Sequence, residues 1–327
     1  MKTFYLSTNI LKEKKFLKNL LFNFVFVIVL FASCTTNNGN KNGNPVVVNV
    51  AAKTSVDSSK QSGDKSDFKY DLKTPDQTWR LPADLVEVSG NSWVDKDHLM
   101  LIEDLHPNLY YLNISSKDAA LEKTIPFQSD DQGKKFDIED VAVVNNLIYA
   151  LWSHGILFKI NNWNASKPDV KEIPTSLSKD NNTEGLCYDP VTKELLIACK
   201  DASGLPDEKK SAKAVYEFDM NSEKLSEKPF LVIHKKDFET LAGDKLDFNP
   251  SAIAIHPVTH DIYLLSTRDN KCMAVYSRDG SLKAFQFIDK ELMPQPEGIC
   301  FSPEGKLYIS SEGKKGEPGN LFEFNVK

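Results

Sequence analysis

The sequence lacks the excess of basic residues that a nucleic-acid-binding protein requires. Its 40 Lys and Arg residues are outnumbered by 46 Asp and Glu residues, which gives a formal net charge of −6. Binding to nucleic acid depends on cationic contacts with phosphate groups. We therefore expect no nucleic-acid partner. The hydrophobic fraction of 41% is ordinary for a globular protein.

Cysteine is scarce, and no pair has the CxxC spacing of a redox or zinc motif. Cys187 and Cys199 lie in one predicted hairpin, whose turn near Val191 would place Cys187 opposite Leu196 rather than Cys199. Unpaired cysteines behave as small hydrophobic residues. We therefore expect four of them to be buried and free, namely Cys187, Cys199, Cys272 and Cys300.

Familiar catalytic signatures are also missing. The chain contains no nucleophile elbow, HExxH sequence, P-loop or recognisable Cys/His pair. Sustained helical periodicity is missing as well, which argues against a helical or α/β enzyme. Two classes of function remain, a binding module and a metal-dependent hydrolase.

The N-terminal 33 residues have the features of a lipoprotein signal peptide. Four lysines between Lys12 and Lys18 precede an apolar run over 20–32. This run is too short for a membrane span of roughly 20 residues. The small residues Ala32 and Ser33 stand directly before Cys34, as in a lipobox. The alternatives are an ordinary signal peptide and an uncleaved anchor.

Cys34 is therefore the predicted lipidation site, and its acyl chains would hold the protein to a lipid bilayer. Thr35 rather than Asp follows it, which favours the outer membrane of a bacterial cell envelope. Residues 34–76 are polar and poor in large apolar side chains, so we expect a flexible linker. The folded domain is predicted over 77–327.

This domain contains a repeated strand. Its five copies begin with EVSGNSWV, DIEDVAVV, NTEGLCYD, NPSAIAIH and QPEGICFS. Their third residues are Ser89, Glu139, Glu184, Ser251 and Glu297, spaced 50, 45, 67 and 46 residues apart. A period of roughly 40 to 50 residues is typical of four-stranded propeller blades.

Short apolar segments with turn residues between them follow each repeated strand, such as DIYLLSTRD, CMAVYS and KAFQFI. The fifth repeat runs out of chain before its fourth strand, and the segment starting at Gln77 can supply the missing one. We predict an all-β fold, a five-bladed β-propeller of four-stranded antiparallel blades closed by an N-terminal strand. The alternative is six blades, with a degenerate one in the 67-residue interval.

The repeated strands bring carboxylates toward a central channel. Side chains alternate along a strand, so positions one and three of each repeat face the same way. Glu139, Glu184 and Glu297 would meet, and such a group needs protons or a hard cation. Oxygen donors suit Ca²⁺, and the lack of His and Cys disfavours zinc. We expect calcium bound by these three residues, with Asp137 as the next ligand.

A ligand beside the metal would meet further polar residues. First positions of the repeats and the loops after the second strands supply Glu87, Asn182, Asn249, Gln295, Arg268 and Asp269. Arg268, Lys200 and His154 would form a rim able to hold a small anionic or polyhydroxy ligand. The alternative is that these loops are simply solvated. Gly90, Gly185 and Gly298 follow the acidic position, where we expect crowding at the axis.

The segments NTEGLCYDPVTKELLIACKD, NPSAIAIHPVTHDIYLLS and QPEGICFSPEGKLYISSE resemble the SdiA-regulated propeller family. The resemblance extends over 77–327. It implies a five-bladed β-propeller with a calcium site and without an established enzymatic activity. More distant architectural relatives are NHL-repeat propellers, calcium-dependent phytases and gluconolactonase-type lactonases.

We therefore expect a calcium-binding propeller tethered to the envelope that acts as a non-catalytic binding or sensing module for an unidentified small molecule or protein. The alternative is a phytase-like or lactonase-like metal-dependent hydrolase at the same carboxylates. A phytase needs a dense ring of basic residues, and a lactonase needs Asn and Asp ligands where this chain has Glu. Both points favour binding.

Overall fold

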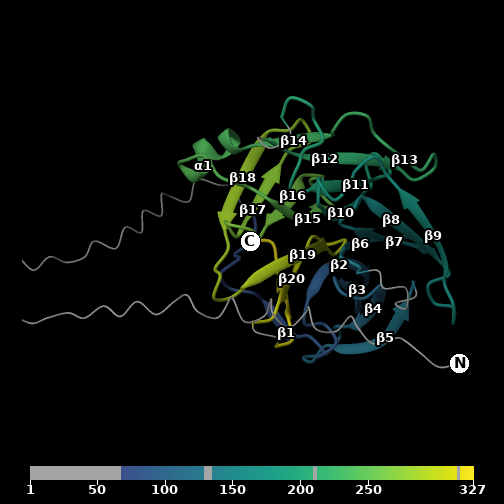
Figure 1. Cartoon of the computed structure of the whole chain (residues 1–327). Helices are drawn as coiled ribbons and strands as arrows, with labels where there is room; N and C mark the ends of the chain where they lie inside the picture. Colours follow the sequence, from purple (N-terminus) through teal and green to yellow (C-terminus); the bar gives the residue numbers. More distant parts are fainter. Residues whose placement is uncertain (1–67, 129–134, 209–211, 315–316) are drawn as a thin grey trace, which may run out of the picture. The chain divides into compact units, whose positions relative to one another are not determined.

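The computed structural model describes residues 68–128, 135–208, 212–314 and 317–327, and these residues form β-structure almost throughout (Figure 1). The predicted signal peptide, the predicted lipidation site Cys34 and most of the predicted linker lie outside the described residues. Among the residues described, no helix has the length and apolar character needed to cross a bilayer.

Five antiparallel sheets form the blades of a propeller. Blade 1 consists of β2 (Val88–Asp95), β3 (His98–Glu103), β4 (Asn108–Asn113) and β5 (Ala120–Pro126). Blade 2 consists of β6 (Ile138–Val144), β7 (Leu147–Trp152), β8 (Ile156–Asn161) and β9 (Asp169–Pro174). Blade 3 consists of β10 (Thr183–Asp189), β11 (Glu194–Cys199), β12 (Ala212–Asp219), β13 (Lys224–Leu225) and β14 (Leu231–His234).

The remaining two blades complete the ring. Blade 4 consists of β15 (Pro250–Ile255), β16 (Ile262–Ser266), β17 (Cys272–Tyr276) and β18 (Leu282–Phe287). Blade 5 consists of β19 (Gln295–Phe301), β20 (Leu307–Glu312), β21 (Asn320–Phe324) and β1 (Gln77–Arg80). The first strands of the blades, β2, β6, β10, β15 and β19, meet around the central axis (Figure 1).

The predicted closure by an N-terminal strand is confirmed. β1 pairs antiparallel with β21, and Gln77 lies opposite Glu323. The alternative of a sixth blade is wrong. The long interval instead holds η1 (Lys235–Phe238), α1 (Glu239–Ala242) and a divided outer strand, because β13 and β14 both pair with β12.

The turns that end the inner strands are held by side chains of the turn itself. In blade 3, Asp189 Oδ1 accepts a hydrogen bond from the Val191 amide at 2.9 Å. In blade 4, His256 Nδ1 lies 3.2 Å from the amide nitrogen of Val258, as its acceptor. Such turns can be short because a polar side chain at the strand end accepts hydrogen bonds from the backbone amides of the turn. His256 therefore has a structural role in this turn.

The hydrophobic core lies between neighbouring blades and extends beyond the predicted domain boundary. Phe68, Tyr70 and Leu72 are buried, and they pack with residues of blades 4 and 5. The Tyr70 hydroxyl donates to the Gly305 carbonyl at 2.6 Å. The folded domain thus includes residues from Phe68 onward, so the boundary predicted at Gln77 is too late.

The four cysteines of the propeller are free, as expected. Cys187 pairs in register with Leu196, which is the predicted partner. Burial raises the pKa of the Cys199 thiol to about 12. A thiol of this kind stays protonated at neutral pH and acts as a packing residue.

Candidate functional site

Each inner strand carries an irregularity at the same place. The register of pairing with the second strand shifts between Ile138 and Asp140, between Thr183 and Gly185, and equivalently in the other three blades. The skipped residues include Ser89, Glu139, Glu184, Ser251 and Glu297, which are the third positions of the repeats. A β-bulge turns the side chain of its extra residue in a new direction. Strand alternation alone, on which the prediction rested, does not include this effect.

The three glutamates lie close enough to affect each other electrostatically. Burial raises the pKa of Glu139 well above its ordinary value, and the charge of Glu184 raises it further. Burial raises the pKa of Glu184 to about 7, against the opposing effect of Lys200. Burial also raises the pKa of Glu297. The structure therefore brings the predicted carboxylates together in a site where not all of them ionise easily.

Lys200 lies inside this group. Its ammonium group donates to Glu184 Oε2, and the exposed fractions of the two side chains are 12% and 6%. Burial alone would lower the pKa of Lys200, but the charges of Glu184 and Glu297 raise it. Asn182 Nδ2 donates to the other Glu184 oxygen at 2.7 Å. The prediction placed Lys200 on the rim, whereas it is the internal cation of the site.

Two further carboxylates enlarge the acidic region, Asp104 of blade 1 and Glu312 of blade 5. Burial and the charge of Glu87 raise the pKa of Asp104 to about 6. Burial and the charge of Glu297 raise the pKa of Glu312 to about 8. Asp104 Oδ1 is buried and has no hydrogen-bond partner among the described residues. Neither residue was among the predicted metal ligands. The signal that could have found them is their position, because Asp104 directly follows the second strand β3 and Glu312 ends the second strand β20.

The first residues of the repeats are tied to the loops that follow the second strands. Asp137 Oδ2 accepts a hydrogen bond from the Ser153 hydroxyl at 2.6 Å. Gln295 Nε2 donates to Glu312 Oε2 at 2.6 Å. Asn249 Nδ2 lies 3.3 Å from Asp269 Oδ2, which accepts its hydrogen bond. In blade 1, the Glu87 carbonyl accepts from the Asp104 amide at 3.3 Å. These loops therefore share one end of the channel with the bulges.

Charge is unevenly distributed around this end of the channel. Arg268 of blade 4 donates to both carboxylate oxygens of Asp201 in blade 3, at 2.5 and 3.4 Å. This pair is partly exposed, so Arg268 does occupy the rim. The basic residues Lys200 and Arg268 thus come from blades 3 and 4. Blades 5, 1 and 2 supply the carboxylates of Glu312, Asp104 and Asp137.

Asp140 follows Glu139 on β6 and is buried. Its carboxylate accepts hydrogen bonds from the amides of Val141 at 2.8 Å and of Leu186 at 2.7 Å, which joins blade 2 to blade 3. A Cβ atom on Gly90 would lie 2.6 Å from the Asp140 Cα. On Gly298 it would lie 2.9 Å from the Asn91 amide nitrogen. The predicted crowding beside these glycines is present, and it leaves no room for side chains there.

The side chains as they stand do not already form a metal centre. In the described part of the chain, no three His, Cys, Asp or Glu side chains are gathered so that they could hold an ion. The donor chemistry nevertheless fits a hard cation, because the group consists of carboxylates with one buried oxygen, Asp104 Oδ1, left without a partner. Binding of an ion would require carboxylates to rotate toward one point.

Comparison with known proteins gives the family and the fold. The glutaminyl cyclase of Myxococcus xanthus superposes with a TM-score of 0.53 at 14% identity, over 78% of this chain and 96% of that one. A protein of unknown function from Bacteroides thetaiotaomicron has a TM-score of 0.47 at 14% identity, over 72% of this chain and 58% of that one. At such identities the likeness concerns the fold alone. No curated protein matches the chain significantly.

A sequence profile of the family described as SdiA-regulated matches residues 85–322. This match includes all five inner strands and every acidic residue of the site described above. The chain therefore belongs to the SdiA-regulated family, and its fold is a five-bladed β-propeller.

Proposed function

We propose that the acidic end of the channel binds Ca²⁺, and that the protein is a non-catalytic binding or sensing module of the bacterial envelope. One observation carries this proposal. Glu184 is buried, the half-buried Glu139 and Glu297 lie close enough to act on it electrostatically, and the Lys200 ammonium group donates a hydrogen bond within this group. With all four groups ionised, two negative charges remain uncompensated. A divalent cation would neutralise them.

The chemistry of the surrounding groups supports calcium as the ion. Ca²⁺ takes six to eight oxygen ligands in a flexible arrangement. Glu139 and Asp137 would hold it from blade 2, and Glu184 and Glu297 from blades 3 and 5. Asp104 offers an additional carboxylate oxygen that has no partner. Lys200 would compete with the ion for Glu184, because both neutralise the same carboxylate.

Calcium binding is tested by titration of the purified, metal-free protein. We expect saturable binding by calorimetry and a rise in melting temperature with Ca²⁺, since a ligand that binds only the folded state stabilises it by about 2.7 kcal/mol at a hundredfold excess over Kd. Glu139→Gln and Glu297→Gln should each weaken binding at least tenfold. Glu172→Gln is the control, because Glu172 is exposed on β9, the outermost strand of blade 2. Absence of both heat and stabilisation would overturn the proposal.

A metal-dependent hydrolase at the same carboxylates is the competing function. Its support is the resemblance in architecture to calcium-dependent phytases and lactonases. Arg268 already pairs with Asp201, so little positive charge on the rim is left to hold a phosphorylated substrate. Release of phosphate from phytate, or opening of an aldonolactone, that depends on calcium and is lost in Glu184→Gln would establish an enzyme instead.

Tethering to the membrane rests on the sequence around Cys34. We propose that this residue is acylated, so that the propeller is held at the outer membrane. The test is incorporation of radiolabelled palmitate in bacteria that express the full chain. Label should appear in the native protein and disappear in Cys34→Ser. Equal labelling of both, or label in neither, would contradict an acylated Cys34.

A further inference from the structure

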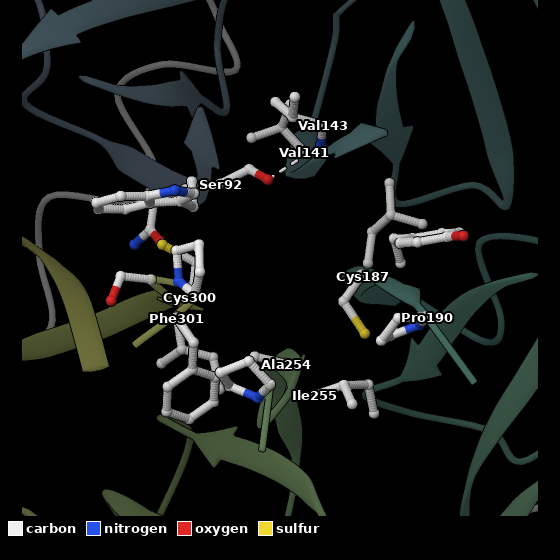
Figure 2. A pocket seen from close by; sticks show the side chains of 17 residues that line it. Ser92, Val141, Val143, Cys187, Pro190, Ala254, Ile255, Cys300 and Phe301 are labelled. Carbon is white, nitrogen blue, oxygen red and sulfur yellow. Dashed lines mark hydrogen bonds between the residues drawn. The ribbon is translucent and has the colours of Figure 1, made fainter. Parts of the chain in front are cut away.

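A cavity opens at the opposite end of the channel from the glutamates. Its volume is about 330 Å³, at the lower limit of the range of about 300 to 1,000 Å³ that is usual for small-molecule sites. Residues from all five inner strands line it, and Figure 2 shows their side chains directed around a common space. Asp140 precedes the lining residue Val141 on β6, so it lies between this cavity and Glu139.

The lining of this cavity is apolar and uncharged. None of the 17 lining residues carries a formal charge. Val141 and Val143 lie on one side and Ala254, Ile255 and Phe301 on another (Figure 2). A charged ligand would lose its hydration here without gaining a partner. The cavity therefore selects against ions and favours apolar surface.

One buried polar atom of the described lining residues, in Asn91, lacks a hydrogen-bond partner. Asn91 is 2% exposed, and its Nδ2 donates to the Ser310 hydroxyl at 2.9 Å. Its Oδ1 is buried and has no partner among the described residues. The other four inner strands place aliphatic residues at the equivalent position, namely Val141, Leu186, Ile253 and Ile299. An unsatisfied buried acceptor costs about 1 to 3 kcal/mol. Rotation of the Asn91 side chain toward the cavity would bring Oδ1 to a ligand that donates a hydrogen bond, and this bond would remove the cost.

We propose that the cavity binds a small uncharged molecule that is mainly apolar and carries one hydrogen-bond donor, such as an alcohol or an N–H group. The apolar body contacts the side chains from the five inner strands, and the donor points to Asn91 Oδ1. The site is separate from the acidic end of the channel, and it stands or falls independently of calcium binding.

The native protein alone gives the first test. Binding of 2-naphthol and of 2-methylnaphthalene is measured by equilibrium dialysis with fluorescence detection. The two probes have nearly the same size, but only 2-naphthol has a donor. We expect saturable binding of both at one site, with 2-naphthol roughly three- to tenfold tighter because of the added hydrogen bond. Equal affinities, or binding that does not saturate, would overturn the proposal.

Three variants locate the site. Ala254→Phe fills the cavity and should abolish binding of both probes. Asn91→Leu should reduce the affinity for 2-naphthol to that for 2-methylnaphthalene. Val258→Ser is the control for adsorption to exposed apolar surface, because Val258 is 68% exposed and lies in a neighbouring turn; it should change neither affinity. Circular dichroism establishes that each variant is folded. Undiminished binding in folded Ala254→Phe would place the probes elsewhere and refute the assignment.

Discussion

The ammonium group of Lys200 donates a hydrogen bond to the carboxylate of Glu184 at the axis of the propeller. Glu184 is buried and Lys200 is mostly buried. Both belong to blade 3, Glu184 in the bulge of β10 and Lys200 directly after β11. The protein thus carries a fixed cation of its own among acidic residues that come from three blades. This pair sets how much charge remains for a bound ion to neutralise.

Loss of Lys200 should strongly destabilise the metal-free protein. Lys200→Met leaves the Glu184 carboxylate buried without its cation, and breaking one partner of a buried pair costs about 3 to 5 kcal/mol. Urea denaturation at pH 8 in the presence of EDTA measures the free energy of unfolding. The double variant Lys200→Met with Glu184→Gln should recover most of the loss, because no unpaired charge remains.

The exposed pair Arg268–Asp201 provides the matched control for that experiment. Arg268→Gln should cost no more than about 1 kcal/mol, since exposed ion pairs contribute little. If Lys200→Met were as mild as Arg268→Gln, the internal cation would not be needed for the charge balance of the site.

Stability of the metal-free protein should fall as the pH rises. The pKa of Glu184 is raised from 4.5 to about 7 and that of Glu312 from 4.5 to about 8. The folded state therefore binds more protons than the unfolded state between about pH 4.5 and 8. The stability contributed by these extra protons is fully present below pH 4.5 and is lost as the pH rises through 7 and 8. Melting temperatures at pH 5.5, 7 and 8.5 in EDTA measure this effect.

Calcium should oppose this loss of stability, because the ion replaces the protons on the carboxylates. The fall in melting temperature between pH 5.5 and 8.5 should be smaller with Ca²⁺ than in EDTA, and smaller in Glu312→Gln than in the native protein. A melting temperature that rises with pH in EDTA would show that the carboxylates ionise freely in the folded state.

A methyl group on Gly90 should disrupt the junction of blades 1 and 2. The new Cβ would lie 2.6 Å from the Asp140 Cα, a distance that backbone atoms can relieve only by moving apart. We expect Gly90→Ala to lower stability by about 1 to 3 kcal/mol, as overpacking of a core does. Gly280→Ala is a useful comparison, because its new Cβ would contact only Leu231, at 3.7 Å. Any loss of stability in this variant would arise from the backbone φ of 85°.

Thermal melting of both glycine variants, with a Ca²⁺ titration of Gly90→Ala, separates the two effects. Gly90→Ala should weaken calcium binding as well as stability, whereas Gly280→Ala should affect stability alone. Native-like stability of Gly90→Ala would mean that the blades can separate there at little cost.

Tyr70 should contribute substantially to folding although it precedes the first strand. It is fully buried and packs against His256, Tyr263 and Phe301. Tyr70→Ala should cost about 3 to 5 kcal/mol, as for other large aromatic truncations. Tyr70→Phe keeps the ring and loses the hydrogen bonds of the hydroxyl to the Gly305 carbonyl and to His256 Nε2, so about 1 to 2 kcal/mol is expected. Equal stabilities of the two variants in urea denaturation would exclude a packing role.

The architecture could be predicted because it repeats. Five copies of one strand, each followed by short apolar segments with turns, fix the number of blades, and a last blade one strand short identifies Gln77 as the start of the closing strand. The boundary of the domain could not be placed as well. Phe68, Tyr70 and Leu72 lie in a polar segment without strand periodicity, and only contacts with distant residues bury them.

The candidate site was predictable in composition but not in arrangement. Position along the repeat brings Glu139, Glu184 and Glu297 to one end of the channel. The bulges that direct these side chains follow from the register of pairing, which a sequence pattern does not contain. Lys200 is the first residue after a second strand, and nothing in its neighbours shows that it turns inward instead of to solvent.

The seam between β1 and β21 has a consequence for biogenesis. Asp76 accepts a hydrogen bond from the amide of Asn325, 249 residues further along the chain. During synthesis, four blades can form before β21 is available to pair with β1. Until that strand is made, the open sheet edges remain exposed. A substitution that disrupts the final strand should therefore reduce the yield of folded protein far more than the ligand affinity of the molecules that do fold.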